Sequence, residues 1–184
     1  MCKMDNGLTC CFTGHRPQGL PCGGDEGAPA CMRLKDALRR EIAALVEERG
    51  VTRFISGMAL GIDQWAAELV AELRGRYPHL RLEGAVPCAG QESGWNRDKQ
   101  LHYHALRRQC DRWTILQPAY TRGCMQARNR YMVDNSDIVL AVWNGRPGGT
   151  GSTVAYARKR GRCLLILDPV TAEPVSAANT FFVP

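Results

Sequence analysis

The chain has 184 residues and a formal net charge of +6, a length that suits one domain with a sizeable core. It contains no run of about 18 apolar residues and no apolar signal-peptide core at its start, so we expect a cytoplasmic protein without a membrane partner. Most of its 24 Lys and Arg residues are arginines, and they are spread along the chain. This distribution gives little support for nucleic acid as a partner.

The nine cysteines are not arranged as a metal site. No C-x-x-C pair occurs, and Cys22 and Cys31 lack a second pair at zinc spacing. His102 and His104 are two residues apart, which would place their imidazoles on different faces of a helix. We therefore predict no metal site, and cysteines that are reduced and partly buried.

Strands and helices alternate along the chain. The expected elements are strands over residues 8–12, 52–56, 80–86, 112–116, 138–143 and 163–167, and helices over 31–49, 62–73, 97–110, 128–135 and 153–161. The strands are apolar runs without a period of two, which is typical of a parallel sheet buried on both faces. The pattern predicts an α/β, doubly wound, mainly parallel sheet in one domain over 1–184, with its core at about 8–168. Residues 181–183 are a candidate edge strand.

The most informative stretch follows the apolar run 138–143. Residues 144–153, NGRPGGTGST, read as a glycine-rich turn that leads into a helix. A strand, a glycine turn and a helix in succession present free backbone N–H groups to a phosphate, and the helix dipole favours negative charge there. We predict a phosphate-binding turn over residues 148–152.

Polar residues also follow the first two strands, where α/β sheets place their ligands. The first strand ends in Thr13-Gly14-His15-Arg16, and Pro17 restricts Arg16 to an extended conformation. A second glycine turn over 57–63 ends in Asp63. Asp63 either accepts a hydrogen bond from a ligand hydroxyl or serves the dipole of the following helix.

Other candidates lie in the loops and helices farther along the chain. Trp95 and Tyr120 each present a flat ring that could stack on a base or pack on the surface. Arg128 is expected to contact a phosphate, with an ion pair at the helix start as the alternative. Asn129 is either a ligand contact or a helix cap.

Taken in order, five motifs resemble the YpsA-like members of the SLOG superfamily over about residues 8 to 168. They are Thr13-Gly14-His15-Arg16-Pro17, Ser56-Gly57-Met58-Ala59-Leu60-Gly61-Ile62-Asp63, Trp95-Asn96, Arg128-Asn129-x-x-Met132-Val133-Asp134 and Asn144-Gly145 with Gly148-Gly149-Thr150. The resemblance implies a Rossmann-like fold and a nucleotide or nucleotide-derived ligand. The superfamily also holds the DNA-processing protein DprA and the "lonely guy" cytokinin-activating phosphoribohydrolases.

The phosphoribohydrolases carry a P-G-G-x-G-T-x-x-E motif whose glutamate takes part in cleaving the N-glycosidic bond. Here the phosphate-binding half is kept, but Ser152 stands at the threonine and Ala155 at the glutamate. An alanine can neither transfer a proton nor stabilise an oxocarbenium ion. The resemblance therefore implies a phosphate site without that catalytic group.

We expect a protein that binds or senses a nucleotide, such as an adenine nucleotide, ADP-ribose or an NAD-like molecule. One alternative is an enzyme acting on a nucleotide or nucleoside phosphate with Glu92 or Asp63 as acid or base, and another is a DprA-like DNA-associated protein. Whether the protein forms a homo-oligomer stays open. The predicted ligand-binding residues are Thr13, Gly14, His15, Arg16, Ser56, Gly57, Met58, Gly61, Asp63, Trp95, Asn96, Tyr120, Arg128, Asn129, Asn144, Gly148, Gly149, Thr150, Gly151, Ser152 and Thr153.

Overall fold

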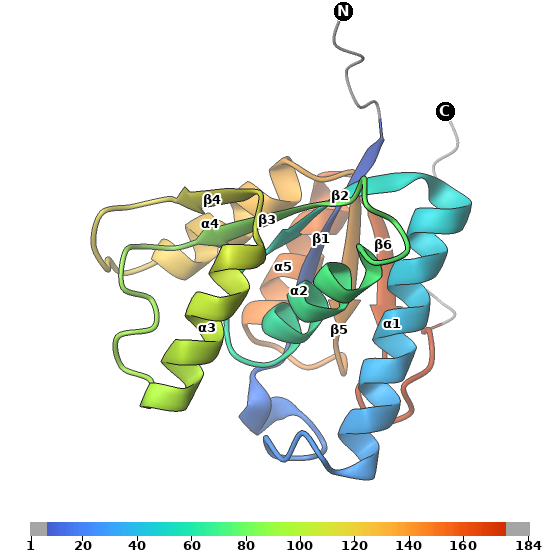
Figure 1. Cartoon of the computed structure of the whole chain (residues 1–184), viewed down its shortest axis with the longest axis horizontal. Helices are drawn as coiled ribbons and strands as arrows, with labels where there is room; N and C mark the ends of the chain where they lie inside the picture. Colours follow the sequence, from blue (N-terminus) through green and yellow to red (C-terminus); the bar gives the residue numbers. More distant parts are fainter. Residues whose placement is uncertain (1–6, 176–184) are drawn as a thin grey trace, which may run out of the picture.

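The computed structural model describes residues 7–175, which form one parallel sheet with helices on both faces (Figure 1). The strands are β1 (Leu8–Gly14), β2 (Val51–Ser56), β3 (Arg81–Val86), β4 (Arg112–Ile115), β5 (Ile138–Val142) and β6 (Cys163–Leu167). The helices are α1 (Pro29–Arg49), α2 (Ile62–Leu73), α3 (Arg97–Gln109), α4 (Cys124–Asp134) and α5 (Gly149–Lys159), with a short 3-10 turn η1 (Pro17–Gly19). The predicted α/β, Rossmann-like fold is confirmed.

The sheet has the strand order β4-β3-β2-β1-β5-β6, and every pair within it is parallel. The chain builds outward from β1 to β4 on one side and then returns to add β5 and β6 on the other. The order therefore reverses between β1 and β5. Open α/β sheets bind ligands outside the carboxyl ends of the strands at such a reversal, so this junction is where a site is expected.

Both faces of the sheet are buried, which explains the apolar strands. Cys10 and Phe12 of β1 pack in the larger cluster with α1, α2 and α3, whereas Cys11 between them packs in the cluster with α4 and α5. Successive side chains of a strand point to opposite faces, so a strand covered on both sides needs apolar residues at each position. Figure 1 shows α1, α2 and α3 in front of the sheet and α4 and α5 behind it.

Glu83 is an exception in this apolar sheet. It lies in β3 with only 1% of its surface exposed and accepts hydrogen bonds from Tyr131, Thr114 and Arg53 at 2.7, 2.8 and 2.6 Å. Burial by itself raises the pKa of this carboxyl group, but the three donors outweigh it and hold the pKa below its usual value. The ionised carboxylate thus connects β3 to α4, β4 and β2.

Two helices begin earlier than the sequence predicts. The structure starts α4 at Cys124 rather than at 128, because Gly123, with a φ of 89°, turns the chain into the helix. It starts α5 at Gly149 rather than at 153. Glycines favour a turn over a helix by propensity, but Val154 and Ala157 pack against the sheet and fix the helix position. The predicted glycine turn is therefore shorter, and its second half is the first turn of α5.

The expectation that the cysteines are reduced is wrong for one pair. Cys22 and Cys31 form a disulfide, with their Cα atoms 5.9 Å apart. The chain folds back between η1 and α1, which brings two residues nine positions apart into the range for such a bond. The other six cysteines within residues 7–175 are free.

No helix in the described part of the chain is long and apolar enough to cross a membrane. The candidate edge strand at 181–183 lies outside the described residues.

Candidate functional site

A cavity of about 250 Å³ opens at the reversal between β1 and β5. We call it the central cavity. Its walls come from the residues after β1, from the β2–α2 loop, from α4 and from the start of α5. It is lined by Thr13, Gly14, His15, Arg16, Ala59, Asp63, Met125, Arg128, Asn129, Gly149 and Thr150. Nine of these eleven residues were predicted from the sequence, and Ala59 and Met125 were not.

The N-terminus of α5 forms one wall of the central cavity. The first backbone bond of the helix runs from the N–H of Ser152 to the carbonyl of Gly148 at 2.9 Å. The N–H groups of Gly149, Thr150 and Gly151 precede that bond and have no acceptor within the helix. Gly148 supplies no capping side chain, and the first turn contains no acid. These amides and the positive end of the helix dipole are thus available to an anion.

Arg16 and His15, which follow β1, also line the central cavity and bring basic groups to it. Arg16 is extended, with φ −71° and ψ 163°, as predicted from the following Pro17. The Nε2 atom of His15 accepts a hydrogen bond from the backbone N–H of Asn144 at 3.4 Å. Burial lowers the pKa of His15, and a contact with the side chain of Asn144 opposes this only in part. An anion in the central cavity would meet both these basic residues and the free amides of α5.

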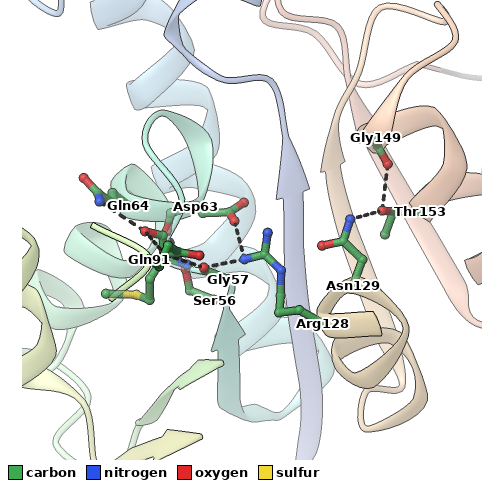
Figure 2. A network of polar contacts seen from close by, with 10 residues as sticks. Ser56, Gly57, Asp63, Gln64, Gln91, Arg128, Asn129, Gly149 and Thr153 are labelled. Carbon is green, nitrogen blue, oxygen red and sulfur yellow. Dashed lines mark hydrogen bonds and ion pairs between the residues drawn. The ribbon is translucent and has the colours of Figure 1, made fainter. Parts of the chain in front are cut away.

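Arg128 is buried and holds the β2–α2 loop in place (Figure 2). Its Nη1 donates to the carbonyl oxygen of Gly57 and lies 3.4 Å from Oδ2 of Asp63. The sequence left open whether Arg128 contacts a phosphate or pairs with an acid. The structure pairs it with Asp63, while both residues also line the central cavity.

Burial disfavours the charges on both members of this pair. It raises the pKa of Asp63, and Arg128, the backbone N–H of Ala59 and Arg16 oppose the shift. It likewise lowers the pKa of Arg128, with the attraction of Asp63 opposing. Removing one partner of such a pair leaves an uncompensated buried charge and costs about 3–5 kcal/mol. The pair is therefore a fixed part of the cavity wall.

The β2–α2 loop is held in place by further polar contacts. Ser56 is fully buried, and its hydroxyl donates to the carbonyl of Asp63 at 2.7 Å and accepts from the N–H of Met58 at 3.1 Å. Met58 has a φ of 56°, which is uncommon for a residue other than glycine. Gly61, with a φ of 94°, lies so close to the chain after β1 that a β-carbon would come within 2.6 Å of the His15 carbonyl oxygen. These residues, which were predicted from the sequence, fix the loop from which Ala59 and Asp63 line the central cavity.

Asn129 joins α4 to α5. Its side-chain amide donates to the hydroxyl of Thr153 at 2.9 Å, and that hydroxyl donates to the carbonyl of Gly149 at 2.9 Å. Figure 2 shows that Arg128 and Asn129 reach to opposite sides of β1. Two consecutive residues of α4 thus contact the β2–α2 loop on one side and the first turns of α5 on the other.

Some predicted residues lie outside the central cavity. Tyr120 is 72% exposed and does not line the central cavity. Asn96 caps α3 by accepting from the N–H of Lys99 at 3.0 Å. Trp95 lines a different cavity of about 280 Å³, together with Gln91 and Leu60. We call it the Trp95 cavity, and it shares Arg16 with the central cavity.

A third cavity lies between α4 and α5 and has a volume of about 400 Å³. We call it the Tyr156 cavity. Ser152, Thr153 and Ala155 line it, together with four residues outside the predicted set, Gln126, Arg130, Tyr156 and Lys159. A helical wheel of α5 could have found Tyr156 and Lys159, which follow Ser152 at helical spacing. Within residues 7–175, no group of three or more His, Cys, Asp or Glu side chains could hold a metal ion.

The fold is a Rossmann-like α/β fold, and a cavity at its topological switch point is lined by basic side chains and the N-terminus of α5. A family model described as the YspA SLOG family (YpsA) matches residues 10–160. The chain therefore belongs to the YpsA family of SLOG proteins, as the motifs predicted.

Two relatives are described without a named activity. The chain is 31% identical over 143 residues to the uncharacterized SPbeta prophage-derived protein YoqJ of Bacillus subtilis (strain 168), covering 71% of this chain and 84% of that protein. It is 34% identical over 152 residues to a UPF0398 protein of Bacillus thuringiensis (strain Al Hakam), covering 81% and 82%.

Among solved structures, the fold is similar to that of DNA processing protein A from Helicobacter pylori, described for its single-stranded DNA binding mode. The TM-score is 0.58 at 20% identity, over 89% of this chain and 66% of that one. The chain thus spans slightly less than two thirds of that protein. At this identity the similarity establishes the fold alone.

Proposed function

We propose that this protein binds a nucleotide or nucleotide derivative, with a phosphate group in the central cavity over the N-terminus of α5. One observation carries the proposal: Arg16, His15 and the free amides of Gly149 and Thr150 line the same cavity at the switch point of the sheet. Phosphate is the group that a guanidinium and a helix N-terminus together recognise best.

Binding without catalysis is the role that the side chains favour. Asp63 is the one carboxylate that lines the central, Trp95 and Tyr156 cavities in the described chain, and it is paired with Arg128. Glu92, the other acid or base considered, lines none of them and lies 3.7 Å from the imidazole of His104. Ala155 faces the Tyr156 cavity where the phosphoribohydrolase motif has its glutamate. No free acid is therefore placed to protonate a leaving base.

A DNA-associated role is the second candidate. The H. pylori protein with the same fold is described as binding single-stranded DNA, and the cations Arg130 and Lys159 lie beside the central cavity. The expectation that nucleic acid is not a partner therefore finds no support. Both candidates require a phosphate group at the same place.

Titration calorimetry with AMP and adenosine tests the phosphate site. Losing one charge-assisted hydrogen bond costs about 1.5–3 kcal/mol, roughly ten- to a hundredfold in affinity. Arg16→Ala should therefore weaken the binding of AMP by about this factor and the binding of adenosine much less. Arg158→Ala is the matched control, because Arg158 is exposed on α5 and lines none of the three cavities. Equal losses for AMP and adenosine would show that Arg16 does not contact the phosphate.

A further inference from the structure

The central cavity adjoins a cavity on each side. It shares Arg16, Ala59 and Met125 with the Trp95 cavity, and Asn129 and Gly149 with the Tyr156 cavity. Helix α4 contributes to all three, through Met125 at one end and Asn129 in the middle. The three cavities therefore adjoin one another, and the proposed phosphate position lies in the middle one.

The Trp95 cavity has the character of a base pocket. Trp95 packs edge-on against Tyr103, with ring centroids 5.4 Å apart, and its carbonyl accepts from Gln100 at 2.9 Å. Pro17 and Leu60 supply further apolar surface. A half-exposed indole held in one orientation offers a platform on which a base can stack.

The Tyr156 cavity, on the other side of the central cavity, is likewise lined by an aromatic side chain. The Tyr156 hydroxyl donates to the carboxylate of Asp134, at 3.0 and 3.1 Å from its two oxygens, which fixes the ring. The Arg130 guanidinium lies 5.6 Å from the ring centroid. Lys159 also lines this cavity, and no carboxylate does. An aromatic ring with a guanidinium over one face, in a cavity that a second cation lines, suits a second base and the phosphate next to it.

The central cavity by itself is small for a whole ligand. Ligand sites typically measure about 300–1,000 Å³, whereas the central cavity has about 250 Å³. The adjoining cavities, of about 280 and 400 Å³, offer the additional volume that a larger ligand needs.

We infer that the ligand contains two nucleosides joined through phosphate, with the linkage in the central cavity and one base in each flanking cavity. This inference rests on the proposed function, since it takes the phosphate position from it. Two sources share this chemistry: a free dinucleotide, and two adjacent nucleotides of a single strand.

Calorimetry on the full chain tests the inference with defined probes. These are AMP, the 5′-phosphorylated dinucleotide d(ApA), NAD as a pyrophosphate-linked dinucleotide, and the single strand (dA)8. At least one two-nucleoside probe should bind about tenfold or more tightly than AMP, because a second stacked base adds to the contacts. Tightest binding by NAD or d(ApA) identifies a free dinucleotide, and tightest binding by (dA)8 identifies a strand.

A variant that fills one flanking cavity provides the structural control. Ala155 is exposed and lines the Tyr156 cavity, so Ala155→Phe should fill the cavity without disturbing the core. The ratio of the AMP Kd to the dinucleotide Kd should then fall toward one. Lys159→Ala should lower the same ratio, whereas Arg158→Ala, its neighbour outside the cavities, should leave it unchanged.

The outcomes separate this inference from the function on which it rests. AMP binding as tightly as every two-nucleoside probe overturns the inference and leaves the phosphate site intact. An unchanged ratio in Ala155→Phe also overturns it. Failure of the protein to bind any of the four probes overturns the proposed function itself.

Discussion

Gly57 lies where the structure leaves no room for a side chain. A β-carbon there would meet the guanidinium of Arg128 and lie 2.6 Å from Oδ2 of Asp63. Both residues are buried, so Gly57→Ala should push Arg128 away from Asp63 and from the carbonyl of residue 57. Breaking a buried pair costs about 3–5 kcal/mol, and we expect about 3 kcal/mol, since a displaced arginine keeps part of its hydration. For a chain of this size that corresponds to a Tm lower by about 6–12 °C.

Urea denaturation followed by circular dichroism measures the effect, with Gly149→Ala as the matched control. No atom lies within 4 Å of a β-carbon at Gly149, so the control should change stability by less than about 0.5 kcal/mol. Repeating Gly57→Ala in an Arg128→Met background should give a smaller loss, because the clashing guanidinium is gone. Equal stability of the two alanine variants, or full additivity with Arg128→Met, would refute the reasoning.

Three further predictions concern pH and catalysis. Because the pKa of Glu83 is lowered, its contribution to stability is complete above about pH 4.5 and is lost as the pH falls through the lowered pKa. Glu83→Gln should therefore reduce the loss of unfolding free energy at acid pH. Identical losses in the two proteins would contradict this. His15 has a lowered pKa in the free protein, and a bound phosphate should raise it, so AMP affinity should increase as the pH falls toward that lowered pKa. His15→Gln should lose that increase, and parallel calorimetric profiles for the two proteins would disprove the coupling. With Ala155 at the glutamate position, incubation with AMP should release no adenine above a control without protein, and steady release proportional to protein concentration would show that another group compensates.

The sequence predicted the parts of the fold that depend on local patterns. All six strands of the sheet within residues 7–175 were predicted. A strand buried on both faces, such as β5, was recognised as an apolar run because it leaves no alternation to interpret, whereas β4 is partly exposed. The topological rule for parallel sheets then placed the crevice beside Thr13–Arg16, and the central cavity lies there. Pro17 also fixed the backbone of Arg16 in the extended conformation that was expected.

Features that depend on contacts between residues far apart in the chain could not be predicted from local sequence patterns. The pairing of Arg128 with Asp63 joins residues 65 positions apart, and spacing gives no information about such a contact. The flanking cavities arise from the packing of α4 on α5, so Arg130 and Tyr156 looked like ordinary surface residues. The start of α5 was misplaced because glycine propensity suggested a turn, whereas packing of the next turns against the sheet decided the helix.

The central claim is that a phosphate binds over the first turn of α5. Titrating the 15N-labelled protein with AMP and following the amide signals tests it most directly. We predict saturable shifts of the Gly149, Thr150 and Gly151 amides, much weaker shifts with adenosine, and their loss in Arg16→Ala. AMP binding that leaves these three amides unshifted and moves signals elsewhere would contradict the claim.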